Sequence, residues 1–292
     1  MPLQQVTLTL SRPDLQRTIL FQLDTDHPAQ RSIFEKLSQN HLYEPDTTLL
    51  LSNLLQAGDS FIDIGAHVGF FSMLAAACLG PAGRVYAFEP DHTNYLHLLS
   101  HLALNHLDNV LPFHWAVGEQ SKIVDLYFNS DNDGGHALWN PGLHAHGRQS
   151  RLRLSKSQAF QVKLDDLFIT ARPGAFKAIK IDVEGNELHV LQGARNFLRA
   201  ARVPAVIAEI NSFALAQLNS SERQIRELMA DLDYLPYLLL LEKPTRLTTD
   251  QYLKSKYVFN LLFITPELQQ IVASQWPQST SLEDALRARQ EL

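Results

Sequence analysis

Short apolar runs alternate with amphipathic stretches through most of this chain, and this alternation constrains the fold more than any other feature of the sequence. Runs of strand length occur at 60–65, 84–90, 110–117, 178–185 and 204–210. Apolar residues at helical spacing lie between them, at 70–80, 92–105 and 186–200. Near-continuous apolar strands joined by amphipathic helices are typical of a parallel sheet covered on both faces. The sequence therefore predicts an α/β fold with a doubly wound, mostly parallel sheet of Rossmann-like class.

The segment before this core carries a different pattern. Residues 1–58 hold a predicted strand pair, 4–10 with 17–24, and two helical stretches on either side of a break at 43–46. We expect this N-terminal region to pack on the core as an addition to it.

The segment after the core holds two further apolar runs, 234–242 and 257–265, which predict an antiparallel last strand pair at the edge of the sheet. The tail is predicted to be helical, with a capping-box pattern from Thr280 to Glu283. The expected regions are an N-terminal addition at 1–58, a main domain at 59–265 that contains the 129–150 stretch as an inserted loop, and a C-terminal helical tail at 266–292.

Composition excludes several classes of protein. The 292 residues carry a formal net charge of −6, so nothing draws the whole chain to nucleic acid or to an anionic membrane. The single cysteine, Cys78, cannot form an internal disulfide. No apolar run reaches the roughly 20 residues of a membrane span, and the N-terminus lacks a signal-peptide pattern. We therefore expect a cytoplasmic protein without nucleic-acid partners or a membrane span.

The first core strand runs into a glycine turn, "FIDIGAHVGFF" at 61–71. Gly65 and Gly69 do not form the G-x-G-x-x-G fingerprint of dinucleotide binding, and no P-loop is present. Glu89 ends the next strand, where a carboxylate can accept hydrogen bonds from both ribose hydroxyls of an adenosine. Asp63 would repel a pyrophosphate but would suit a cationic ligand. S-adenosylmethionine (SAM) fits both carboxylates, whereas a tight turn without a ligand is the simpler alternative.

A second acidic cluster follows a later strand, "IKIDVEGNE" at 179–187. Asp182 and Glu184 come before the next helix, and Glu209 ends the following strand, so these three are expected at the ligand-binding edge of the sheet. Such carboxylates could orient a hydroxyl, take its proton, hold an amino group or bind a metal. Glu187 could instead serve only the helix macrodipole.

Together these stretches resemble the FkbM-type methyltransferases, SAM-dependent enzymes that mostly methylate hydroxyl oxygens. The resemblance covers about residues 40–215 and says little about the acceptor. His67 stands where the family often has Asn. The matching motifs are "YEP" at 43–45, "FIDIGAHVGFFSMLAA" at 61–76, "VYAFEPD" at 85–91, Asn105, "IKIDVEGNELHVLQGA" at 179–194 and "PAVIAEI" at 204–210.

The resemblance implies the class I methyltransferase fold and a set of cofactor contacts. The residues implied at the methionine end of SAM are Asp63, Gly65, Ala66 and Gly69. Glu89 and Pro90 would bind the ribose, Glu44 would close the pocket, and Asp182 would also reach the cofactor. The residues implied around the adenine are Asn109, Val110, Ala116 and Val117.

An irregular stretch at 129–150 contains four glycines and three histidines without any regular period. A loop this long inside a compact domain is often a lid or a binding loop, so we expect it to cover the site with His136 and Trp139. A solvated loop is the alternative, and His144 with His146 is not expected to bind a metal. The histidines expected at the surface of a helix are His97, His101 and His106.

The predicted chemistry is metal-independent O-methylation of a hydroxyl on a small-molecule, sugar or lipid-like acceptor. The candidates for the base are Asp182, Glu184 and Glu209, with His136 in reserve. A Mg²⁺-assisted reaction using Asp182 and Glu209 is the alternative chemistry. An NAD-dependent oxidoreductase and a catalytically silent SAM-fold protein are the alternative functions.

Overall fold

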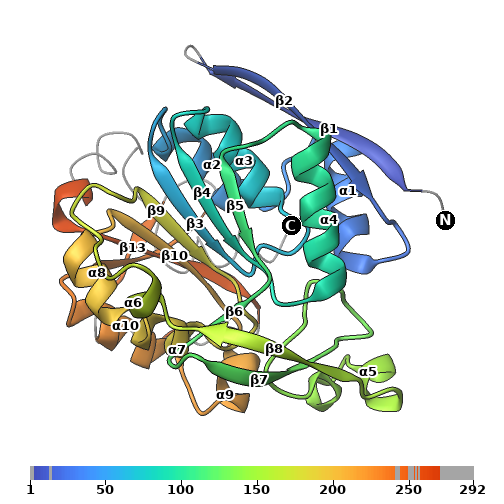
Figure 1. The fold of residues 1–292 in the computed structure, drawn as a ribbon. Helices are drawn as coiled ribbons and strands as arrows, with labels where there is room; N and C mark the ends of the chain where they lie inside the picture. Colours follow the sequence, from blue (N-terminus) through green and yellow to red (C-terminus); the bar gives the residue numbers. More distant parts are fainter. Residues whose placement is uncertain are drawn as a thin grey trace.

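The computed structural model describes residues 3–12, 15–240, 244–248, 253, 255 and 257–269. Its centre is an eight-stranded sheet in the order β12-β11-β13-β10-β9-β3-β4-β5 (Figure 1). The five strands from β10 to β5 in this order are mutually parallel, which confirms the predicted fold class. Their bounds are β3 (Ser60–Ile64), β4 (Arg84–Phe88), β5 (Val110–Phe113), β9 (Ala178–Ile181) and β10 (Ala205–Ile210).

The other end of the sheet is antiparallel. β13 (Phe259–Ile264) lies between β10 and β11 (Leu235–Leu238) and runs antiparallel to both. The predicted last strand pair is thus confirmed, but a short extra strand, β12 (Thr245–Arg246), forms the outer edge. The register places Asn260 of β13 opposite Glu209 at the carboxyl end of β10.

Helices cover both faces of the sheet. Successive residues of a strand point to opposite sides, so both faces carry apolar side chains that need to be covered. In β3, Phe61 joins one apolar cluster and Ile62 joins the other. The first cluster packs under α2 (Pro45–Leu54), α3 (Phe70–Leu79) and α4 (His92–Leu104). The second packs under α7 (Glu187–Gln192), α8 (Arg195–Ala201) and α10 (Glu222–Ala230).

The N-terminal strands β1 (Gln4–Arg12) and β2 (Leu15–Leu23) pair with each other and lie outside the central sheet, followed by α1 (Pro28–Ser38). Phe21 of β2 stacks on Phe70 of α3 with ring centroids 5.4 Å apart. The expectation that His101 lies at the surface is wrong. Its ring is buried between β2 and the glycine turn, where Nδ1 lies 2.7 Å from the Val68 carbonyl oxygen and Nε2 accepts the Gln22 N–H.

A second, three-stranded sheet was not predicted. It has the order β6-β8-β7 and lies below the central sheet in Figure 1. The expected strand 110–117 therefore divides, since β5 ends at Phe113 and the chain crosses to the second sheet at Trp115. The strands of this sheet are β6 (Ala116–Val117), β7 (Lys122–Tyr127) and β8 (Lys156–Val162).

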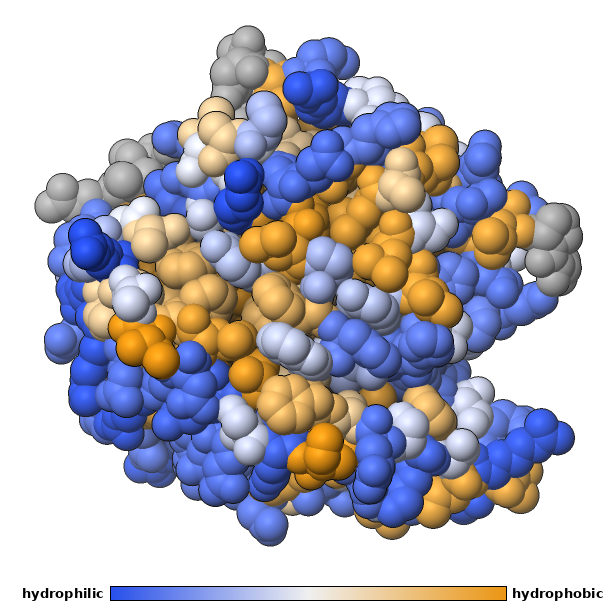
Figure 2. Space-filling view, viewed as in Figure 1, coloured by the Kyte–Doolittle hydropathy of each residue, from blue (hydrophilic) through white to orange (hydrophobic). Residues whose placement is uncertain are grey.

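The segment 129–150 is the connection between β7 and β8, with a 3₁₀ turn, η1 (Pro141–Leu143), and the start of α5 (Arg148–Leu152). Its backbone returns to β7 through a bridge from Ala137 to Tyr127. Figure 2 shows a notch on the right of the molecule. The region that contains α5 lies below this notch.

The predicted helix at 186–200 is two helices, α7 and α8, that are separated at Gly193. A side chain at Gly193 would meet the carbonyl oxygen of Gly118, the residue that follows β6, at 2.1 Å. The turn after β6 therefore lies directly against the backbone at the junction between α7 and α8. The two remaining short helices are α6 (Leu164–Leu167) and α9 (Ser212–Gln217).

Of the predicted helical tail, residues 266–269 are helical. Residues 270–292, including Thr280 and Glu283, lie outside the described residues. Within the described part of the chain, no helix is both long enough and apolar enough to cross a membrane.

Candidate active site

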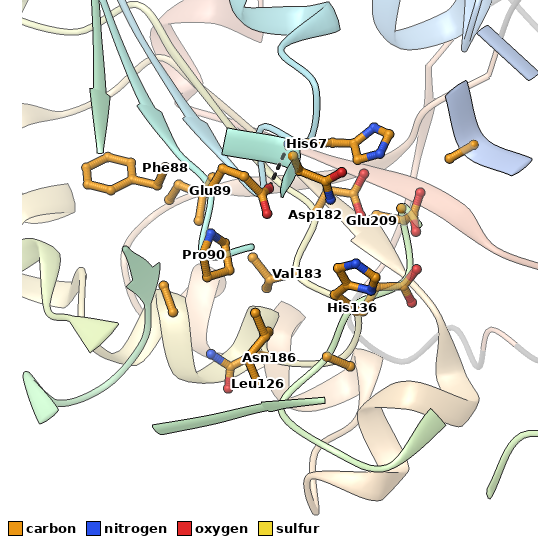
Figure 3. A pocket seen from close by; sticks show the side chains of 18 of the residues that line it. His67, Phe88, Glu89, Pro90, Leu126, His136, Asp182, Val183, Asn186 and Glu209 are labelled. Carbon is orange, nitrogen blue, oxygen red and sulfur yellow. Dashed lines mark hydrogen bonds between the residues drawn. The ribbon is translucent and has the colours of Figure 1, made fainter. Parts of the chain in front are cut away.

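A cavity of about 330 Å³ opens at the carboxyl ends of the parallel strands. The turns that follow β3, β4, β9 and β10 line one side of it, and residues 132–138 of the β7–β8 connection line the other. This is the sheet edge where ligands bind in open α/β folds, and the volume lies within the range of small-molecule sites. In Figure 3, Asp182 and Glu209 lie close together with His136 beneath them, while Glu89 and Pro90 lie to their left.

The glycine turn brings backbone to the floor of this cavity. Gly65 has φ +82°, and a side chain there would lie 1.8 Å from the Asp182 carbonyl oxygen, so only glycine fits. Gly65 lines the cavity as predicted. Gly69 does not, because it caps α3 and faces Leu98, and Ala66 instead donates its N–H to Phe88.

Glu89 lies in the cavity wall at the end of β4, as the sequence predicted. Its Oε2 accepts the His67 backbone N–H at 2.8 Å (Figure 3). Its Oε1 accepts the Asp91 backbone N–H, also at 2.8 Å. Burial raises the pKa of this carboxyl to about 7. Each oxygen keeps a further lone pair for a ligand hydroxyl. Pro90 lines the cavity beside it.

Asp63 is buried below the cavity rather than in its wall. The Ser72 hydroxyl donates to its Oδ2 at 2.6 Å, and burial raises the pKa of the carboxyl. The predicted direct contact with a cofactor is therefore not supported by its position.

Four further predicted carboxylates line the cavity besides Glu89: Glu44, Asp182, Glu184 and Glu209. Oxygens of Glu44, Asp182 and Glu209 lie within 4.8 Å of one another. Glu44 belongs to the N-terminal region. It is the residue just before α2, and its backbone is in the left-handed conformation with φ 39°. The structure thus brings together Asp182, Glu184 and Glu209, as their positions at strand ends predicted, and adds Glu44, which only the resemblance had placed near them.

The half-buried acids of the cavity wall have raised pKa values. Burial raises the pKa of Glu44 to about 7. Burial and the charge of Asp182 raise the pKa of Glu184 to about 8, and the same two causes raise that of Glu209 well above its usual range. Glu184 and Glu209 therefore favour their neutral forms near pH 7.

Lys180 is a site residue that the sequence argument missed. Its buried ammonium lies 2.7 Å from Asp182 Oδ2. The available signal was a lysine between Ile179 and Ile181, in a strand that is otherwise apolar.

Glu187, for which two roles were left open, serves the local backbone. Its Oε1 accepts the N–H groups of Val183 and Gly185 at 3.1 Å and thereby holds the turn that presents Asp182 and Glu184.

Two of the four residues implied around the adenine line the cavity. Ala116 and Val117 line the cavity together with Phe88 and Trp115. Asn109 and Val110 do not, because they lie at the opposite end of β5. The Asn109 side chain donates to the carbonyl oxygens of Ala76 and Gly80, and Val110 joins an apolar cluster.

The β7–β8 connection packs over the cavity, at the sheet edge where we expected it. Trp139 Nε1 donates to the Glu184 carbonyl oxygen at 2.7 Å. Asp133 fastens the connection to the glycine turn, because its Oδ2 lies 3.0 Å from His67 Nε2, and to α1, because its Oδ1 accepts the Ala29 N–H. The hydrogen bond with His67 and that residue's charge lower the pKa of Asp133 to about 2, although burial opposes them.

His136 lines the cavity, but its hydrogen bonding disfavours the role of a base. Its Nδ1 accepts the Asn129 N–H at 3.0 Å, so a neutral ring carries its proton on Nε2. Burial lowers the pKa of this imidazole, which favours the neutral form. A ring in this state can donate a hydrogen bond from Nε2 but offers no free lone pair there.

The sequence matches the model of the Methyltransferase FkbM domain over residues 63–236. The chain belongs to the FkbM methyltransferase family. This confirms the resemblance that the sequence motifs indicated. The "YEP" motif at 43–45 lies outside the matched range. A comparison with curated proteins finds no match.

Solved structures of methyltransferases are similar to this FkbM-family chain. Methyltransferase FkbM from Methylobacillus flagellatus KT is 19% identical, with 75% of this chain and 47% of that chain covered and a TM-score of 0.46. This chain therefore spans about half the length of that relative. M. jannaschii TYW2 in complex with AdoMet is 12% identical, with 90% and 88% covered and a TM-score of 0.43. A SAM dependent methyltransferase from Aquifex aeolicus is 13% identical, with 76% and 90% covered and a TM-score of 0.42.

Proposed function

We propose that the cavity binds SAM and that the chain transfers a methyl group to a hydroxyl oxygen of a small-molecule, sugar or lipid-like acceptor. The observation that carries the proposal is the meeting, in one cavity, of the Gly65 turn, Glu89 and the carboxylates at the ends of β9 and β10. Glycine at position 65 leaves room for a ligand against the backbone, and the excess of acids suits a cationic cofactor.

Residues of this chain would divide the cofactor between them. Glu89 would accept the ribose hydroxyls, Phe88 and Val117 would flank the adenine, and the turn at Gly65 would receive the methionine end. The residues that we propose at the cofactor are therefore Glu44, Gly65, Glu89, Pro90, Ala116, Val117 and Asp182.

SAM supplies, when bound, a methyl group on a sulfonium that is already a strong electrophile. The protein has to hold the acceptor oxygen in line and remove its proton. Asp182 is our first candidate, because Lys180 holds its Oδ2 in an ion pair. The other oxygen, Oδ1, accepts no hydrogen bond from any residue that the structure describes. Such a base contributes about 10²–10⁴-fold to the rate.

Binding is the first test. S-adenosylhomocysteine (SAH), the demethylated product, should raise the melting temperature of the purified chain, and NAD should not. The opposite result would support the oxidoreductase alternative, which the family assignment already disfavours.

Turnover is the second test. Methylation of a panel of hydroxyl compounds should survive EDTA, whereas activity that EDTA abolishes and Mg²⁺ restores would support the metal-assisted alternative. Once an acceptor is known, Asp182→Asn should lower kcat more than the comparison variants do, and by a larger factor than it lowers SAH affinity. The comparison variants are Glu184→Gln, Glu209→Gln and His136→Ala. Binding of SAH without any turnover would favour a catalytically silent protein.

A further inference from the structure

Lys180 is a charged residue in a buried strand of the central sheet. It is the third residue of β9, and its side chain is buried between the sheet and α3. A buried ammonium is strongly unfavourable unless charges and hydrogen bonds compensate for the lost water. The groups that lie around the Lys180 ammonium therefore indicate which interactions compensate for its burial.

Its surroundings are acidic and aromatic. Nζ lies 2.7 Å from Asp182 Oδ2 and 4.7 Å from the centroid of the Phe71 ring. The register pairs Lys180 with Asp63 on the neighbouring strand. Acidic side chains from the end of its own strand and from the neighbouring strand thus lie beside the ammonium.

The same carboxylates resemble a set of metal ligands. Glu44, Asp182 and Glu209 bring oxygens within 4.8 Å of one another, and oxygen ligands are what Mg²⁺ and Mn²⁺ prefer. An ammonium beside Asp182 competes for these oxygens and repels a second cation. Ammonium and metal are therefore alternatives at this cluster.

We propose that Lys180 is a positioning residue that acts as the fixed internal cation of the cluster formed by Glu44, Asp182 and Glu209, in the place that a divalent metal would otherwise fill. Its ion pair fixes the orientation of the Asp182 carboxylate and leaves Oδ1 for the acceptor. The part that concerns the acceptor rests on the proposed function; the part that concerns the cation does not.

The test compares wild type with Lys180→Met and Lys180→Arg, and with Lys177→Met as a matched control just before β9. Melting temperatures are measured in EDTA and then with excess Mn²⁺ or Mg²⁺. Wild type, Lys180→Arg and the control should not respond to either metal, because a cation is already in place. Lys180→Met should be less stable in EDTA and should regain about 2 °C or more with Mn²⁺, since its carboxylates are then free to bind the metal.

Two results would overturn the inference. One is a metal-induced rise in the melting temperature of wild type that Glu209→Gln abolishes, because it would show that a metal occupies the cluster beside Lys180. The other is a folded Lys180→Met variant that does not respond to any metal.

A double variant decides the case in which Lys180→Met does not fold. Lys180→Met with Asp182→Asn removes both charges of the pair, so it should fold and stay insensitive to metal. Failure of the double variant as well would show that Lys180 does not serve Asp182, and would overturn the inference.

SAH affinity separates this inference from the proposed function. In metal-free buffer, wild type should bind SAH if the proposed function is correct, whatever the metal experiment shows. Lys180→Met should lose about tenfold or more in that affinity, and Lys180→Arg should recover most of it. If wild type does not bind SAH, the proposed function is contradicted. The melting-temperature comparison with metals still tests the role of Lys180 as the internal cation.

Discussion

Glu184→Gln should flatten the pH dependence of this protein's stability. Glu184 lies in the cavity wall, and burial with the charge of Asp182 raises its pKa from 4.5 to about 8. Glutamine has the shape of the neutral acid and can keep the contact with Asn211, whose Nδ2 lies 3.4 Å from Oε2. The variant therefore removes the titration with little change in packing.

The sign and size of the effect follow from that pKa. Between about pH 4.5 and about pH 8 the folded protein holds a proton at Glu184 that the unfolded chain has lost, so stability falls as pH rises. The contribution is fully present below about pH 4.5 and is lost as pH passes through about 8. A group that titrates alone over this interval changes the free energy of unfolding by about 5 kcal/mol. The charge of Glu184 is coupled to those of the neighbouring Asp182 and Glu209, so Glu184 does not account for the whole change alone. We therefore expect the loss of stability over this interval to differ by about 2–3 kcal/mol between wild type and variant.

Denaturant unfolding at about pH 5 and about pH 8.5, without ligand, measures this difference. Wild type should lose clearly more stability over the interval than Glu184→Gln. Glu35→Gln, an exposed carboxyl on α1, is the control and should follow wild type. Parallel curves for wild type and Glu184→Gln would show that Glu184 is ionised in the unliganded protein and would refute the reasoning.

Three other substitutions test the site. Glu89→Ala should weaken SAH binding by about 1–3 kcal/mol in calorimetry, and unchanged affinity would remove Glu89 from the cofactor site. Gly65→Ala should lower the melting temperature and abolish SAH binding, because the added carbon would meet the Asp182 carbonyl oxygen at 1.8 Å; a variant that binds normally would mean that the turn can move. Trp139→Phe removes the hydrogen bond to Glu184 and should speed hydrogen exchange in 129–150, whereas unchanged exchange would show that other contacts hold the connection.

The sequence predicted those features that depend on local pattern and strand order. Glu89 and Asp182 each follow an apolar strand of a parallel sheet, so chain direction alone brings them to one edge. Gly65 was predicted on similar grounds, because it lies in the glycine turn between an apolar strand and the following helix.

The errors concern residues whose role depends on contacts distant in sequence. Gly69 faces Leu98, which lies on another helix, and Asn109 anchors the end of α3 from the far end of β5. His101 is buried only because β2 crosses α4, which no local pattern of α4 records. The second sheet was missed because its longest strands are half-exposed, and β7 and β8 are separated by a connection without any period.

The carboxyls of the cavity connect the binding of a cation to the generation of a base. Glu184 and Glu209 favour their neutral forms in the unliganded protein because they are buried beside Asp182. A sulfonium near them would lower their pKa values, so these acids would ionise only when the methyl donor is present. After transfer the sulfonium charge is gone, and the same acids would take up protons again. We therefore expect the preference of the site for SAM over SAH to increase as pH rises toward about 8, because ionised carboxylates distinguish the charged cofactor from the neutral thioether. Calorimetric affinities for both ligands across that range measure the ratio, and a ratio independent of pH would show that these acids do not face the sulfonium.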